Sequence, residues 1–115
     1  MDGTIYKIAR ISEWGEAVSA GVFTGSPDDR RDGFIHFSTA TQVRATCDKY
    51  FSAEERFYLV AADAGRLGPA LKWEFSRGGQ DFPHLYGPLP LALVRSVTEI
   101  RRGPDGRHVF PPEIV

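Results

Sequence analysis

The chain has 115 residues, of which 42% are hydrophobic and 25% are charged, and its formal net charge at pH 7 is −1. This length and composition predict a single domain, residues 1–115, with one buried core, and they exclude a disordered chain. The near-zero net charge gives no broad attraction to nucleic acid or to anionic membranes, so we expect neither as a partner.

Cellular location is indicated by three features of the sequence. The longest apolar run, residues 57–62, is far shorter than the roughly 20 residues that cross a bilayer. The first residues lack the basic and apolar segments of a signal peptide. Cys47 is the single cysteine, so no intramolecular disulfide can form. Together these features predict a cytoplasmic protein without a membrane span.

The first 32 residues predict a strand, a helix and a loop. Residues 4–9 alternate apolar and polar side chains and contain β-branched types, which is typical of a strand. A helix is expected over 13–20, with Ser12 as its N-cap and Gly21 as its C-cap. Residues 22–32 are rich in Gly, Ser, Pro and charge and predict a loop, whose charged part is a mobile flap or, preferably, a solvated turn.

The middle of the chain predicts a strand, a capped helix and a central strand. The strand is expected over 33–37, with His36 near its end, and the helix over 40–51. Hydroxyls at 38, 39 and 41 are each able to cap that helix. The apolar run 56–62 indicates a buried central strand.

The remaining segments predict a second group of strands. Residues 71–75 alternate strictly, which places Lys72 and Glu74 on one face as a surface ion pair. Residues 77–83 predict a loop, and 84–90 contain too many prolines for a central strand. A strand over 94–101 and a short one over 107–110 predict a terminal hairpin. The sum is an α+β fold with two early helices and a strongly bent, largely antiparallel sheet.

His36 is the first candidate for chemistry. It ends an apolar strand and precedes hydroxyl residues at a helix start, where free amides attract anions and carboxamides. An imidazole there can donate to a ribose hydroxyl or move a proton. The alternative is a histidine hydrogen-bonded within its strand, and residue types alone slightly favour that alternative.

The segment 82–90 is the second candidate, because its prolines fix an irregular backbone suited to a ligand wall. Tyr86 can stack on a flat ring, and His84 can hydrogen-bond to a ligand. Equally, these aromatic residues can fill the core. No His-x-x-x-His or His-x-His spacing predicts a metal site, and no glycine-rich nucleotide motif is present.

Two blocks, DGFIHFST at 32–39 and FPHLYGPLP at 82–90, closely resemble the signature blocks of a small bacterial family known as domain of unknown function 952. The segments 5–8 and 21–23, the helix around Trp14 and the pair Trp73-Glu74 also fit. The likeness covers nearly the whole chain. The fold of that family is similar to that of the ADP-ribosyltransferases, a split-sheet domain that binds NAD.

The resemblance also implies site residues. The first strand of such domains carries a ribose-contacting residue, usually His, and Lys7 stands there in this chain. The block that lines the nicotinamide pocket corresponds to His36, Phe37, Ser38 and Thr39. The run His36-Phe37-Ser38 is similar to a His-Leu-Ser run in the RNA 2′-phosphotransferase branch. Glu74 is the candidate for the catalytic glutamate.

Three functions follow from these observations. The first is a binding domain for NAD, ADP-ribose or a related nucleotide, with NAD as ligand or substrate rather than a resident cofactor. The second is an active NAD-dependent ADP-ribosyl- or 2′-phosphotransferase-type enzyme, in which His36, His84 and Glu74 are catalytic and Lys7, Phe37, Ser38, Thr39 and Tyr86 bind the ligand. The third is a non-catalytic structural or partner-binding domain.

Overall fold

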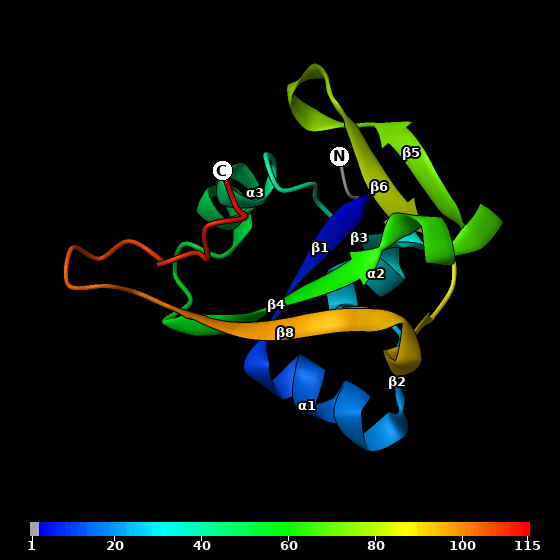
Figure 1. Cartoon of the computed structure of the whole chain (residues 1–115), viewed down its shortest axis with the longest axis horizontal. Helices are drawn as coiled ribbons and strands as arrows, with labels where there is room; N and C mark the ends of the chain where they lie inside the picture. The colour runs from blue at the N-terminus through cyan, green and yellow to red at the C-terminus, as the bar shows by residue number, and fades with distance from the viewer. Residues whose placement is uncertain (1–2) are drawn as a thin grey trace.

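A computed structural model describes residues 3–115 of the chain (Figure 1). These residues form three antiparallel sheets. The first contains β1 (Thr4–Ala9), β4 (Arg56–Asp63) and β8 (Val94–Arg101), in the order β1-β4-β8. The second pairs β2 (Val22–Phe23) with β7 (Leu89–Pro90), and the third has the order β3-β6-β5, with β3 (Ile35–His36), β6 (Asp81–Leu85) and β5 (Leu71–Phe75).

The described residues also form three α-helices: α1 (Ile11–Ala20), α2 (Pro27–Asp32) and α3 (Val43–Tyr50). Single 3₁₀ turns are η1 (Ala64–Arg66), η2 (Gly68–Ala70), η3 (Arg77–Gly79) and η4 (Leu91–Leu93). The predicted α+β class with mostly antiparallel strands is confirmed, with three early helices in place of two. No helix in residues 3–115 is long and apolar enough to cross a membrane.

Strand alternation divides the core into two clusters, one on each face of the β1-β4-β8 sheet. Odd-numbered residues of β1, such as Ile5 and Ala9, pack with Trp14 of α1. Even-numbered residues, such as Ile8, pack with Cys47 of α3. The helices α1 and α3 therefore lie on opposite sides of this sheet (Figure 1). The predicted central, buried strand is confirmed as β4, which pairs with both neighbours.

The predicted loop over 22–32 is wrong, because it contains β2 and all of α2. Ser26 and Asp29 form a capping box, in which each side chain bonds the backbone N–H of the other, and Pro27 occupies the first turn. Within α2 the buried residue is the carboxylate Asp29. Because α2 is short and buries no apolar residue, its sequence shows no apolar side chains at helical spacing. Its charged residues were then the only signal, and they indicated a solvated turn.

The predicted C-cap Gly21 is confirmed, with a φ of 80° and an N–H that donates to Ala17 O, but the predicted N-caps of both helices are wrong. The helix α1 begins two residues early, so Ser12 lies inside it and Arg10 is the N-cap. The helix α3 begins at Val43 after Gln42, and none of the nearby hydroxyls caps it. Ser38 instead bonds Thr46, and the Thr39 backbone N–H donates to Gln42 Oε1. The gap between β3 and α3 is thus longer than the sequence pattern indicated.

The segment before the last prolines also departs from expectation. Residues Asp81–Leu85 form β6, the central strand of its sheet, so the loop predicted over 77–83 is wrong at 81–83 and the exclusion of a central strand over 84–90 is wrong at 84–85. Pro83 lies within this strand. Pro83 O accepts from Phe37 N, so the missing N–H of Pro83 is on the β3 side. Because β3 has only two residues, few ladder bonds exist there for the proline to remove. The predicted strand over 107–110 is reduced to one bridge between Arg102 and His108.

Candidate functional site

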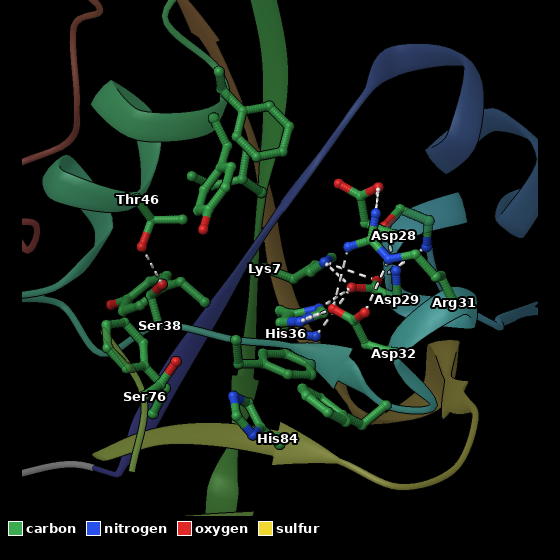
Figure 2. Close-up of a pocket in the computed structure, with 18 of the residues that line it drawn as sticks. Lys7, Asp28, Asp29, Arg31, Asp32, His36, Ser38, Thr46, Ser76 and His84 are labelled. Carbon is green, nitrogen blue, oxygen red and sulfur yellow. Dashed lines mark hydrogen bonds and ion pairs between the residues drawn. The ribbon is translucent and has the colours of Figure 1, made fainter. Parts of the chain in front are cut away.

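A pocket of about 340 Å³ opens between β1, α2, β3 and β6, and we call it the histidine pocket (Figure 2). Five of its polar lining residues come from four separate elements. Lys7 comes from β1, Asp29 and Asp32 come from α2, His36 comes from β3, and His84 comes from β6. Its remaining walls include Phe34, Ser38 and Thr46, which lie between or within the neighbouring elements.

Strand pairing places the two histidines together. His36 of β3 is directly opposite His84 of β6 in the antiparallel register. Side chains of directly opposed residues project from the same face of a sheet, so both rings reach the same pocket. Their ring centroids are 5.6 Å apart. The structure therefore brings together two imidazoles from distant parts of the sequence.

Asp29 is the charged centre of the pocket. Its side chain is 2% exposed, and its two oxygens lie 3.0 and 2.8 Å from Lys7 Nζ. Burial by itself raises the pKa of the Asp29 carboxyl, but the hydrogen bond with His36 and the charge of Lys7 outweigh it, so this pKa lies well below its usual range. Burial lowers the pKa of the Lys7 ammonium, which the charge of Asp29 only partly offsets. The lowered pKa of Asp29 keeps its carboxylate ionised, and the two partners depend on each other.

Both ring nitrogens of His36 face carboxylates. Nδ1 lies 2.5 Å from Asp29 Oδ1, and Nε2 lies 3.0 Å from Asp32 Oδ2. Asp32 is held in turn by Arg31, whose hydrogen bond is the main reason that the pKa of the Asp32 carboxyl is lowered. With both nitrogens occupied, the His36 ring offers a ligand its flat face and its C–H edge.

His84 has a different environment. Its Nδ1 lies 2.8 Å from Glu74 Oε1, and the Tyr86 hydroxyl donates to the same oxygen at 2.7 Å. A carboxylate only accepts, so this contact assigns the hydrogen of a neutral ring to Nδ1. Glu74 does not line the pocket, so Nε2, for which the described side chains provide no partner, is the atom that His84 can offer to a ligand. Phe34 stacks on the ring with centroids 4.0 Å apart.

These contacts change the surroundings expected for Glu74. The predicted ion pair with Lys72 is wrong: Lys72 Nζ lies over the Tyr86 ring, 5.4 Å from its centroid, while Glu74 bonds His84 and Tyr86. The hydrogen bond from His84, with a second from Tyr86, lowers the pKa of the Glu74 carboxyl. The bond to Glu74 in turn raises the pKa of Tyr86. Glu74 and Tyr86 thus lie behind His84 and hold it.

The other predicted ligand-binding residues divide into two groups. Lys7, Phe37 and Ser38 line the histidine pocket, although the Phe37 side chain is 1% exposed and packs in the core. Thr39 and Tyr86 do not line it, and the Thr39 hydroxyl bonds Thr41. The first group can contact a ligand, whereas the second can act only through neighbouring residues.

Sequence reasoning missed the acidic wall of the pocket, which comes from α2. The predicted loop contained all three residues concerned: the acidic Asp29 and Asp32, and Arg31, which holds Asp32. The signal that locates them is Ser26-Pro27 followed by Asp29, which is the pattern of a capping box with proline in the first turn. In residues 3–115 no three His, Cys, Asp or Glu side chains are grouped so that they could hold a metal ion.

Residues 8–97 match the model of a family described as a protein of unknown function (DUF952). Two crystal structures of protein CC0527 from Caulobacter crescentus, one of them a double mutant, share 42% identity with this chain at a TM-score of 0.87. Each match covers 92% of this chain and 93% of the other. A solution NMR structure of CC0527 shares 43% identity over 90% of both chains, with a TM-score of 0.81. No curated protein matches this chain.

Proposed function

We propose that this chain, which belongs to the DUF952 family of proteins of unknown function, binds a nucleoside-like small molecule in its histidine pocket. The first candidate is the nicotinamide-ribose half of NAD, and ADP-ribose and related nucleotides belong to the same class. The proposal includes an ADP-ribosyltransferase-like arrangement of the split sheets, to which the sequence blocks at 32–39 and 82–90 point.

One observation carries the proposal: the rings of His36 and His84, 5.6 Å apart, share one pocket of about 340 Å³. This volume is near the lower end of small-molecule sites, which suits one heterocycle and its sugar better than a whole dinucleotide. The aromatic wall of Phe34, His36 and His84 suits a flat ring. A nicotinamide ring bound to ribose is cationic, which strengthens contact with aromatic faces.

Polar groups of the pocket suit the hydroxyls of a sugar. Asp32 accepts hydrogen bonds and is one-third exposed. His84 Nε2 accepts in the tautomer that Glu74 selects. Lys7 has three N–H donors and contacts the two oxygens of Asp29, so one donor remains for a ligand. Donors and acceptors therefore surround the space beside the aromatic wall.

Calorimetric titration tests this function with four ligands: nicotinamide riboside, NAD, ADP-ribose and a 2′-phosphorylated nucleotide. We expect saturable heat with at least one of them, and at least tenfold weaker binding by a His84→Gln variant. His108→Gln is the matched control, because His108 contacts Cys47 and Glu54 and does not line the histidine pocket. No heat with any of the four at millimolar concentration would remove the proposal and favour a structural or partner-binding domain.

The contact between Glu74 and His84 favours a second candidate, a transferase-type enzyme. A histidine oriented through Nδ1 by a carboxylate is a typical general base at Nε2. In NAD cleavage, His84 Nε2 would take the proton of an attacking hydroxyl while the oxygen of that hydroxyl bonds the anomeric carbon. The bond to nicotinamide breaks, and its electron pair leaves with the nicotinamide nitrogen. Asp32 would stabilise the positive charge that develops on the sugar.

Chromatography separates the two candidates. An enzyme releases free nicotinamide from NAD. With a 2′-phosphorylated nucleotide present, the 2′-phosphate passes to the ADP-ribose unit of NAD and the dephosphorylated nucleotide is released beside nicotinamide. A His84→Gln variant forms none of these products. A binding domain returns its ligand unchanged after prolonged incubation. Saturable heat without product therefore supports the binding function alone.

A further inference from the structure

Strand β5 is an open edge of its sheet. It is the last strand in the order β3-β6-β5, and it lies on the outside of the molecule (Figure 1). Its five residues include no proline, and its register with β6 has no bulge. Natural edge strands are usually shielded by such features, so an unshielded one is a ready template for another strand.

The hydrogen-bond register shows which backbone groups face this open edge. Ser76 N donates to Gln80 O, so the backbone N–H and C=O groups of the even-numbered residues of β5 point toward β6. The backbone C=O of Pro83, which is directly opposite Trp73, accepts a hydrogen bond from Phe37 N and therefore points toward β3. The backbone N–H and C=O of Trp73 consequently point away from β6, as do those of Phe75.

Two large aromatic side chains stand on this strand without cover. Trp73 is 49% exposed and Phe75 is 77% exposed. Both project from the same face of β5 as Leu71, because side chains two residues apart share a face. Lys72 and Glu74 project from the other face. The segment Leu71–Phe75 thus has an apolar face, a charged face and a backbone edge that, among the described residues, is open at Trp73 and Phe75, while the Leu71 N–H donates to Gly68 O.

We propose that β5 pairs antiparallel with β5 of a second copy of this chain, about a two-fold axis at Trp73. In this register Trp73 is opposite Trp73 of the partner subunit, and the two exchange both backbone hydrogen bonds. Lys72 is opposite Glu74 of the partner subunit, and the reciprocal pair forms on the other side of the axis. Leu71 is opposite Phe75 of the partner subunit.

Charge complementarity identifies the partner as a second copy. A lone lysine on an edge strand normally discourages pairing. Here the antiparallel two-fold register brings each Lys72 against a Glu74 in a non-hydrogen-bonded pair, where opposed Cβ atoms are closest. The same register aligns all of the apolar side chains on the opposite face. The pattern around Trp73 is therefore complementary to itself. The pairing does not rest on which ligand the histidine pocket binds, although it shares Glu74 with the support of His84.

Sedimentation equilibrium of the full chain tests the proposal. The interface is one strand wide and belongs to the small, weak class, so we expect the mass to rise from 12.8 kDa to twice that value as concentration increases from micromolar to about millimolar. Trp73→Pro removes the outward backbone N–H and the exposed indole but no hydrogen bond to β6, so it should leave β6 paired and hold the mass at one chain. An NMR spectrum of that variant checks its fold. A wild-type chain that stays monomeric at about 1 mM, or a folded Trp73→Pro chain that still dimerises, would overturn the proposal.

Charge reversal gives a second test that does not depend on proline. Lys72→Glu alone places two glutamates opposite one another, and Glu74→Lys alone places two lysines opposite one another. Each variant should therefore be monomeric by itself. An equimolar mixture restores both opposite-charge pairs in one heterodimer, so its mass should double. A mixture that remains monomeric, while the wild type dimerises, would contradict the register.

Discussion

Asp29 Oδ1 lies 2.5 Å from Nδ1 of His36 and 3.2 Å from the backbone nitrogen of the same residue. One buried carboxylate therefore fixes both the ring of His36 and the strand that carries it. Lys7 balances the charge of Asp29 from the other side. The histidine pocket thus depends on a residue of α2 that need not contact a ligand.

Asp29→Asn tests this dependence. The variant leaves the Lys7 ammonium buried without a counter-charge, which typically costs about 3–5 kcal/mol of stability. We expect a loss of that size in the free energy of unfolding from urea denaturation. Asp28→Asn is the control, because the Asp28 side chain is 64% exposed and its change should cost below about 0.5 kcal/mol. Equal losses in the two variants would show that Asp29 does not hold the site.

Acid sensitivity provides an independent test of the same carboxylate. The folded pKa of Asp29 lies below its unfolded value near 3.8, so its stabilisation is full above pH 4 and declines as the pH falls toward the folded pKa. The stability difference between wild type and Asp29→Asn should therefore shrink below pH 4, by at most about 1.4 kcal/mol per pH unit. Urea midpoints between pH 7 and pH 2 measure it. A difference that stays constant would mean that the pKa of Asp29 is not lowered.

Long alternating segments were predictable from the sequence. The bounds expected for Leu71–Phe75 and Val94–Arg101 match β5 and β8, because β-branched and aromatic residues at every second position specify a strand. The pairing of His36 with His84 had a weaker basis. Both lie in blocks with chemistry-bearing side chains, but only the β3–β6 register places them opposite one another.

The acidic wall was not predictable from hydrophobic pattern. In α2 the buried residue is Asp29, whose burial is stabilised by Lys7 and His36, partners that lie outside the helix. A carboxylate buried through tertiary contacts looks like a solvated one when read locally. The central strand β6 was missed for a similar reason, because the missing N–H of a proline such as Pro83 matters only relative to a neighbouring strand of known length.

Gly25→Ala should damage the site through Asp29. Gly25 has a φ of +109°, and a Cβ there would lie 2.8 Å from Asp29 Cβ. Gly21→Ala is a matched control, because Gly21 has a φ of +80° but open space around it. In Gly21→Ala, backbone strain alone should lower the free energy of unfolding by about 1–2 kcal/mol. We expect Gly25→Ala to cost about 1–3 kcal/mol more in urea denaturation, because the added methyl also displaces Asp29. Equal losses of stability in Gly25→Ala and Gly21→Ala would mean that backbone strain alone causes the effect and that Asp29 is not displaced.

The Glu74 carboxylate should select the tautomer of His84. In the wild type its contact with Nδ1 puts the ring hydrogen there and leaves Nε2 unprotonated toward the pocket. Imidazole nitrogen NMR at about pH 8.5, where an ordinary histidine is neutral, reads this directly. Glu74→Ala should move the hydrogen of His84 partly or wholly to Nε2, because Nδ1 then has no carboxylate acceptor.

Tyr86→Phe is the control for this measurement. It removes the hydroxyl that donates to Glu74 Oε1 and leaves the contact between Glu74 and His84 in place. The tautomer of His84 should therefore stay as in the wild type. A hydrogen on Nε2 in the wild type itself would contradict the assignment, and with it the case for His84 as a proton acceptor, because a protonated Nε2 donates and cannot accept.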